Sequence, residues 1–185
     1  TLDRYTDTPG CLWATVPDVV GDADATAVLC RRWWSAPMRR GYPAAWVAQD
    51  GCRWPPAGPK AVFLGGTTAW KLGPHARAVA REAKRRGMWV HMGRVNSQRR
   101  LRYAHAIGCD TVDGTYLTYA PDRNLPRLLG WLDDLAAQQT LDLDAASGVG
   151  IDVLHAWAYP VSGGAPLFVG ATRPSGARPD VAAIH

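Results

Sequence analysis

Met88-Trp89-Val90-His91-Met92-Gly93-Arg94-Val95-Asn96-Ser97 is the stretch of this sequence that decides the fold. Its first half is mostly apolar and carries aromatic and β-branched side chains, which predicts a buried strand. Ser97 is suited to capping a helix over residues 98–107, and Gly108 is suited to ending that helix. Residues 109–112 predict the next strand, so this part of the chain predicts a parallel βαβ unit.

The same alternation extends along the chain. Further apolar runs predict strands at residues 12–16, 44–48 and 61–64. Helical spacing predicts helices at residues 22–34 and 74–86, and an amphipathic helix that opens at Asn124-Leu125-Pro126. Asp22 or Asp24 is the expected cap of the first helix. Pro74 suits the first turn of the second, and Gly87 suits the position just after its end.

Strands that alternate with helices and are almost continuously apolar predict a parallel sheet covered on both faces. A doubly wound sheet is the alternative, but no G-x-G-x-x-G motif follows a strand. We therefore predict an α/β, TIM-barrel-like (β/α) repeat over residues 1–140. A full barrel needs roughly 250 residues, which predicts a partial barrel with the N-terminal units missing. Residues 141–185 include a segment rich in Pro and Gly and are expected to form a partly flexible C-terminal extension.

The composition of the 185 residues is that of an ordinary globular protein. No apolar run approaches the ~18 residues that span a bilayer, so we expect a cytoplasmic protein with no membrane partner. The four cysteines are scattered without a C-x-x-C pair, which argues against a cysteine zinc site and for reduced thiols.

Positive charge gathers in two parts of the chain. Nine Lys or Arg residues and the single acid Glu82 lie between residues 77 and 102, and four arginines surround Trp33 and Trp34. Basic surfaces attract polyanions such as nucleic acids. A solvated helix face is the alternative interpretation of the same pattern.

Polar residues and glycines follow every predicted strand. They are Asp18 after the first strand, Gln49 and Asp50 after the second, Gly65 and Gly66 after the third, His91, Met92, Gly93, Arg94 and Asn96 at the end of the fourth, and Asp113 after the fifth. In a barrel these positions share one rim, where barrel chemistry takes place. A carboxylate can attack an anomeric carbon, and carboxylate and amide groups bind the edge of a purine. The set therefore favours N-glycosidic chemistry on a nucleobase over phosphoryl transfer.

The same positions resemble a known family. Residues 90–95 with 108–113, 47–51, 64–66 and 16–18 are similar to motifs of the tRNA-guanine transglycosylase superfamily, most closely its DpdA-like branch. That branch inserts deazaguanine bases into the DNA of phages and genomic islands. The resemblance implies a TIM-barrel glycosyltransferase that replaces guanine in DNA, or in tRNA, with a 7-deazaguanine. Its expected partners are the nucleic acid and the free base, without a cofactor.

The resemblance also implies roles for individual residues. Asp113 would be the nucleophile on the sugar C1′, and Asp18 would be the second catalytic residue. Asp18 and Gln49 would bind the base edge, Gly65 and Gly66 would contact the base through backbone, and Met92 would stack on the ring. Asp50, His91, Gly93, Arg94 and Asn96 complete the expected substrate-binding set. The zinc-binding cysteines of the family are absent, so no metal is expected.

One departure from the family pattern leaves other functions open. Nothing before Leu12 matches the family segment that supplies a general acid and base. A non-catalytic nucleic-acid-binding remnant is therefore the first alternative. A small-molecule barrel enzyme, with Arg94 and Asn96 holding a sugar phosphate, is the second. Asp113 as a turn residue, Met92 as a core residue and His91 as a structural histidine also stay open, as does the oligomeric state.

Overall fold

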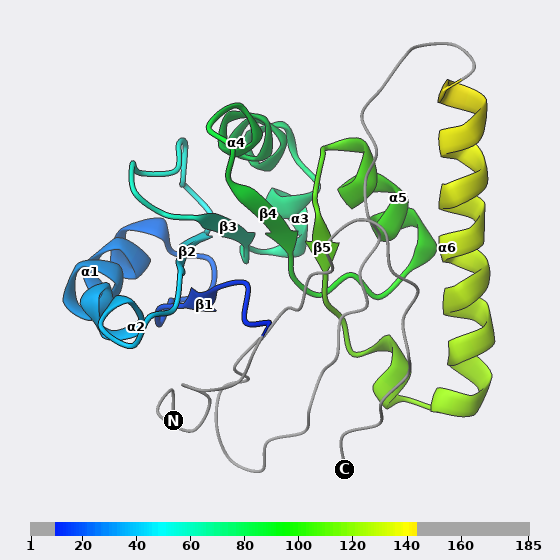
Figure 1. Cartoon of the computed structure of the whole chain (residues 1–185), viewed down its shortest axis with the longest axis horizontal. Helices are drawn as coiled ribbons and strands as arrows, with labels where there is room; N and C mark the ends of the chain where they lie inside the picture. Colours follow the sequence, from blue (N-terminus) through cyan, green and yellow to red (C-terminus); the bar gives the residue numbers. More distant parts are fainter. Residues whose placement is uncertain (1–9, 144–185) are drawn as a thin grey trace.

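The computed structural model describes residues 10–143, with side chains through residue 138 (Figure 1). The chain forms a curled sheet of five parallel strands, half of a barrel, with helices packed against it. The strands are β1 (Ala14–Thr15), β2 (Ala44–Ala48), β3 (Ala61–Leu64), β4 (Trp89–Met92) and β5 (Thr111–Val112). The helices are α1 (Ala23–Trp33), α2 (Ser35–Met38), α3 (Thr68–Lys71), α4 (Pro74–Arg85), α5 (Gln98–Ala106), the 3₁₀ helix η2 (Tyr116–Thr118) and α6 (Pro121–Leu143).

The strand order is β1-β2-β3-β4-β5, the order of the sequence. A doubly wound sheet would reverse its strand order at one point, so that alternative is excluded for the described strands. Register pairs Ala48 with Leu64, Leu64 with Met92, and Met92 with Val112. The carboxyl ends of these strands therefore lie along one edge, as in a partial β/α barrel.

The two faces of the sheet have different neighbours because strand side chains alternate. One set packs against the helices in the main core and includes Val62, Leu64, Val90 and Met92. The other set forms a smaller cluster on the opposite face, where Trp13 meets Ala45 and Ala61, with Phe63 and Trp89 packed against them. Trp89 therefore lies on the face of the smaller cluster, and Met92 lies on the opposite face of the same strand.

Most predicted helix ends are confirmed. The Asp22 carboxylate accepts a hydrogen bond from the Ala25 N–H at 2.9 Å and caps α1. Ser97 caps α5, and Pro74 begins α4. Gly87 follows α4 with a φ of 69°, the left-handed conformation in which glycine has no Cβ penalty.

The predicted start of the last helix is wrong. Helix α6 begins at Pro121, so Pro126 lies inside it. Pro121 follows Ala120, whose φ of 64° turns the chain sharply into the helix. Asn124 does not cap the helix, because its buried amide donates to the carbonyls of Tyr116 and Tyr119 instead.

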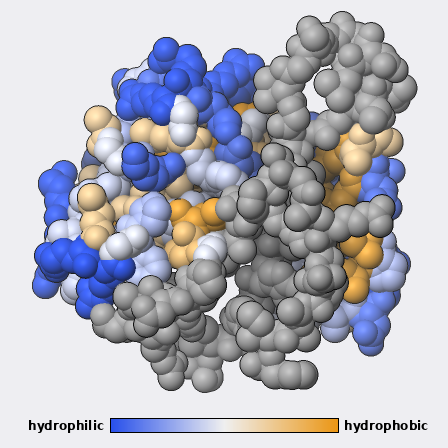
Figure 2. Space-filling model, viewed as in Figure 1, coloured by the Kyte–Doolittle hydropathy of each residue, from blue (hydrophilic) through white to orange (hydrophobic). Residues whose placement is uncertain are grey.

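Helix α6 continues to Leu143, beyond the predicted domain boundary at residue 140. Residues 144–185 of the predicted C-terminal extension lie outside the described residues. Among residues 10–143, no helix combines the length and the apolar character needed to cross a membrane. Figure 2 shows hydrophobic side chains along the side of α6 that faces the sheet and hydrophilic ones along its outer side.

Candidate functional site

Asp113 follows β5 directly and is the centre of a buried polar network. Its side chain is buried, with the residue 7% exposed. The carboxylate Oδ1 accepts the backbone N–H of Arg94 at 2.7 Å, and Oδ2 lies 3.0 Å from His91 Nε2. The Asp113 backbone also pairs with the β4 end, since its N–H donates to the Met92 carbonyl and its carbonyl accepts the Val95 N–H. The carboxylate is therefore fixed in position by neighbours on β4 and the following loop.

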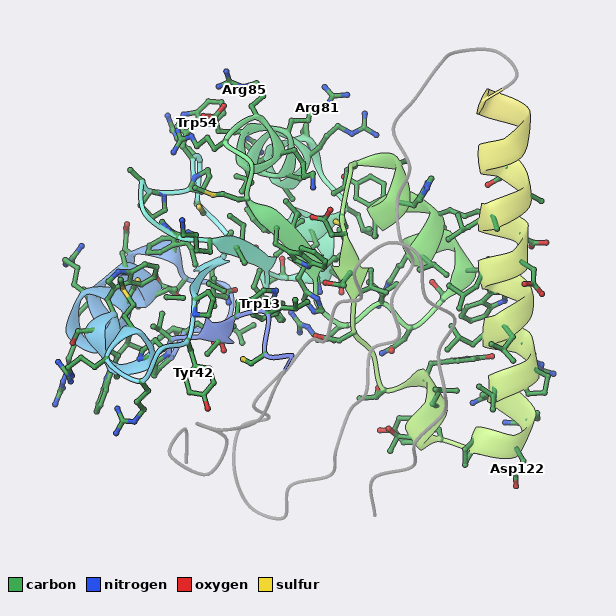
Figure 3. The ribbon with its side chains drawn as sticks, viewed as in Figure 1. Trp13, Tyr42, Trp54, Arg81, Arg85 and Asp122 are labelled. Atoms are coloured by element: carbon green, nitrogen blue, oxygen red, sulfur yellow. The ribbon has the colours of Figure 1, made fainter. Side chains whose placement is uncertain are left out.

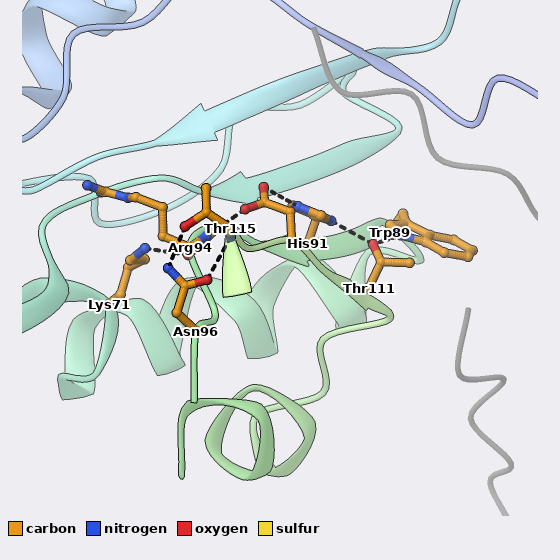
Figure 4. A network of polar contacts seen from close by, with 9 residues as sticks. Lys71, Trp89, His91, Arg94, Asn96, Thr111 and Thr115 are labelled. Atoms are coloured by element: carbon orange, nitrogen blue, oxygen red, sulfur yellow. Dashed lines mark hydrogen bonds and ion pairs between the residues drawn. The ribbon is translucent and has the colours of Figure 1, made fainter. Parts of the chain in front are cut away.

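A chain of hydrogen bonds orients His91 behind this carboxylate (Figure 4). His91 Nδ1 lies 2.8 Å from the Thr111 hydroxyl oxygen, and the Trp89 indole N–H donates to that same oxygen at 2.9 Å. A neutral imidazole with hydrogen on Nε2 satisfies every member: Trp89 donates to Thr111, Thr111 to Nδ1, and Nε2 to Asp113. His91 then holds the carboxylate in one orientation, in the way that an orienting group holds a nucleophile or base.

Arg94 links the ends of three strands. Its side chain reaches the loop after β3, where Nη2 donates to the carbonyls of Gly65 at 2.7 Å and Gly66 at 2.6 Å. Its backbone N–H binds Asp113 after β5, as described above. Its φ of 61° is in the left-handed region that side chains rarely adopt. Geometry that is held against such a preference is common at functional sites.

Close packing requires glycine at the ends of β3 and β4. A Cβ on Gly93 would lie 2.8 Å from the Phe63 ring, and a Cβ on Gly66 would lie 2.6 Å from the Asp50 carboxylate. The N–H groups of Gly65 and Gly66 both point at the Ala48 carbonyl, at 2.9 and 3.3 Å. The backbone groups that were predicted to contact a base are therefore already bonded within the protein in this structure.

Asp18 and Gln49 form the second polar pair at this edge. Gln49 is fully buried, its Nε2 donates to Asp18 Oδ2 at 2.5 Å, and its Oε1 accepts the Gly21 N–H at 2.9 Å. Partial burial of its carboxyl group raises the pKa of Asp18 above its ordinary value, and the hydrogen bond from Gln49 and the charge of Arg94 partly oppose that rise. Gln49 thus orients Asp18, which itself is exposed at the surface.

Asp50 and Asn96 each form hydrogen bonds to the loop after the next strand and so stabilise the loops at this edge. Asp50 accepts two hydrogen bonds of 2.6 Å from Thr67, one from its backbone N–H and one from its hydroxyl, and Thr67 caps α3. Asn96 accepts the Thr115 N–H at 2.8 Å and donates to the Thr115 hydroxyl at 3.2 Å. Both residues connect consecutive strand ends to each other.

Met92 is the predicted site residue that the structure does not bring to the others. It is 1% exposed and packs with Leu64 and Val90 in the core between sheet and helices. Its neighbour His91 faces the opposite side of the sheet, as strand alternation requires. The site residues around Asp113 and those around Asp18 lie along the same edge. Arg94 binds Asp113, and its charge acts on Asp18.

Two polar residues of the network were missed by sequence reasoning. Thr111 lies on β5 and connects His91 to Trp89. Lys71 is the last residue of α3, is 3% exposed, and donates to the Gly93 carbonyl. Burial lowers the pKa of Lys71 to about 8, and the positive charges of Arg94 and Arg100 contribute in the same direction. Thr67, which caps α3, is a residue type that can start a helix, but nothing in the sequence indicates that Lys71 is buried.

The basic segment forms an outer surface over α4. Figure 2 shows hydrophilic side chains gathered there, and Figure 3 shows Arg81 and Arg85 projecting from that helix away from the sheet. Part of the charge is balanced within the protein: Glu82 pairs with Arg85 and Arg86, and Lys84 pairs with Asp110 at 2.6 Å.

Within the described part of the chain, no group of three or more His, Cys, Asp or Glu side chains is arranged to hold a metal ion. Comparisons with protein-family models, with curated proteins and with solved structures found no match for this chain. The functional interpretation therefore depends on the geometry of the strand-end residues.

Proposed function

We propose that this chain is a TIM-barrel-type base-exchange enzyme that replaces guanine in DNA, or in tRNA, with a 7-deazaguanine. In the first step an Asp113 oxygen attacks the sugar C1′, the C1′–N9 bond breaks, and the leaving guanine takes a proton from solvent at N9. In the second step N9 of the incoming base attacks C1′, the Asp113–C1′ bond breaks, and the N9 proton passes to solvent. Atoms and charge balance over the two steps.

The observation that carries this proposal is the position and the hydrogen bonding of the Asp113 carboxylate. It is a buried carboxylate at the carboxyl end of a parallel strand, where barrel enzymes place their chemistry. One N–H and one imidazole hold its two oxygens, and each oxygen keeps a second lone pair for attack. A nucleophile needs this combination of fixed orientation and remaining electron pairs.

The polar pair of Asp18 and Gln49 supports a base-binding role at the other end of the edge. A carboxylate accepts well from the N–H groups on the edge of a guanine-like base. Gln49 fixes the orientation of Asp18, so the carboxylate is held ready to accept from a base. Gln49 would then act through Asp18, because both ends of its buried amide are bonded within the protein.

The basic surface over α4 supports a polyanionic substrate. Arg81 is exposed on this helix and projects outward. Binding to a nucleic acid through such residues releases counterions, so the affinity should fall steeply with salt. This feature fits DNA and tRNA equally.

The test is exchange of labelled guanine into duplex DNA and into tRNA, together with detection of a covalent adduct that survives denaturation. Asp113→Asn keeps the size of the side chain but removes the nucleophilic charge. We expect it to abolish the adduct and to lower the exchange rate by about a thousandfold or more. Asp122→Asn is the matched control, since Asp122 is exposed on α6 far from the strand ends (Figure 3). Unchanged exchange in Asp113→Asn would overturn the assignment.

One observation favours a second candidate, a non-catalytic nucleic-acid-binding remnant. Arg94 already donates to the carbonyls of Gly65 and Gly66, and their N–H groups pair with Ala48. A base could use this backbone only after Arg94 moves. The second candidate predicts salt-sensitive binding of DNA with neither exchange nor adduct in the wild-type protein.

A further inference from the structure

Lys71 is a buried cation that is connected to the proposed nucleophile, Asp113, through one peptide group. It ends α3 and is 3% exposed, and its ammonium group donates to the Gly93 carbonyl after β4 (Figure 4). Lysine is seldom fully buried, because the charged group loses its hydration. Neither the sequence motifs nor the proposed reaction steps above give this residue a role.

The Gly93 carbonyl and the Arg94 N–H belong to one peptide group. The oxygen of that group accepts from Lys71, and its N–H donates to Asp113 Oδ1 at 2.7 Å. A cation at the oxygen of an amide withdraws electron density and makes its N–H a stronger donor. The three groups therefore form a continuous path from the Lys71 ammonium through one peptide to the Asp113 carboxylate.

The same peptide is held in an unfavourable conformation. Arg94, directly after it, has a φ of 61°, which L side chains rarely adopt. Gly93 packs so closely on Phe63 that a Cβ there would lie 2.8 Å from the ring. Lys71 on one side and Asp113 on the other fix the orientation of the peptide against this strain.

We propose that Lys71 is a positioning residue for Asp113, which polarises and fixes the Gly93–Arg94 peptide so that its N–H binds the carboxylate. The catalytic significance of this role rests on the proposed function, in which Asp113 is the nucleophile. The positioning itself is a property of the folded protein and is measurable without any substrate.

Burial, together with the charges around Lys71, sets the pH at which this effect is lost. Burial is the main cause that lowers the pKa of Lys71 to about 8; Arg94 and Arg100 also lower it, and Asp113 raises it. At neutral pH the ammonium is charged and donates to Gly93. Above pH 8 it loses its proton, and the polarisation of the peptide weakens.

The test is the backbone amide resonance of Arg94, followed by ¹H–¹⁵N NMR as the pH is raised from 6.5 to 9.5. In the wild-type protein we expect a step with a midpoint near pH 8, because the Lys71 charge acts on that peptide. In Lys71→Met the step should be absent and the amide proton should move upfield. In Lys71→Arg the amide should stay near its wild-type position without the step, because arginine does not titrate there. Lys84→Met, which removes a partly exposed lysine paired with Asp110, is the control and should retain the step.

A second readout connects the positioning to the proposed reaction. We expect Lys71→Met to lower kcat for base exchange roughly tenfold with little change in KM, less than the loss of a direct donor, and Lys71→Arg to restore most of it. An Arg94 amide resonance that is the same in Lys71→Met as in the wild type at pH 7 would overturn the positioning role by itself. A normal step with no detectable base exchange would instead count against the proposed function and leave the positioning role supported.

Discussion

Replacing Lys71 with methionine should change how the stability of the protein depends on pH. Methionine has a similar length and no charge, so it removes a buried ammonium without leaving a large cavity. The variant also leaves the Gly93 carbonyl without its donor, which costs about 1–3 kcal/mol at any pH. The informative quantity is therefore the difference in the free energy of unfolding between wild type and variant, followed as the pH changes.

The magnitude follows from the pKa of Lys71, which is about 8 in the folded protein against an ordinary value of 10.5. Below pH 8 the lysine is protonated in both the folded and the unfolded chain, and its burial destabilises the fold by a constant amount. Between pH 8 and 10.5 the unfolded chain binds the proton more tightly, so stability rises with pH. The full shift corresponds to about 3 kcal/mol, of which about 2 kcal/mol develops by pH 10, where the lysine of the unfolded chain is still partly protonated.

The measurement is urea unfolding followed by tryptophan fluorescence, at intervals of half a pH unit from pH 7 to 10. We expect the free energy of unfolding of the wild type to gain about 2 kcal/mol over Lys71→Met across this range. Lys84→Met corrects for general effects of removing a lysine, because Lys84 is 40% exposed. If the free energies of unfolding of the wild type and of Lys71→Met changed in parallel with pH, the titration of a buried ammonium at Lys71 would be refuted.

Three further perturbations test the packing around the site. Gly93→Ala places a Cβ 2.8 Å from the Phe63 ring and should destabilise the fold by about 1–3 kcal/mol, with partial recovery when Phe63→Leu is added; no recovery would contradict the packing explanation. Asp22→Ala removes the cap of α1 and should lower the free energy of unfolding by about 1 kcal/mol in urea titrations, whereas Asp22→Asn should retain most of it. Cys109 is buried and desolvation raises the pKa of its thiol, so mass spectrometry should find it unmodified by iodoacetamide in the native protein and modified in urea; rapid native alkylation would argue against its burial.

The strands were predictable wherever burial on both faces left a purely apolar run. Residues 44–48 and 61–64 were predicted with the bounds that β2 and β3 have. The start of α6 was not, because Pro126 is a common first-turn residue and the sharper turn at Ala120 leaves no strong signal. The four-residue helix α3 was also missed, since it is too short to show a helical period.

The sequence could predict which edge of the sheet holds the candidate site, but not the hydrogen bonds between its residues. The order of parallel strands is enough to place Asp18 and Asp113 along the same rim. Strand alternation also separates Met92 from His91, so spacing alone could have shown that both side chains cannot face one side. Lys71 was out of reach, because a lysine at a helix end usually extends into solvent, and only tertiary packing buries it.

At position 94 the backbone conformation favours glycine, whereas the contacts of the side chain require arginine. Its left-handed backbone would be easier for glycine by about 1 kcal/mol, and that backbone is what directs its N–H to Asp113. Its guanidinium holds the Gly65 and Gly66 carbonyls with two charge-assisted bonds, which together outweigh that strain. A glycine would therefore relax the loop but remove both bonds to the β3 end, so the arginine side chain is what connects that end to the segment that binds Asp113.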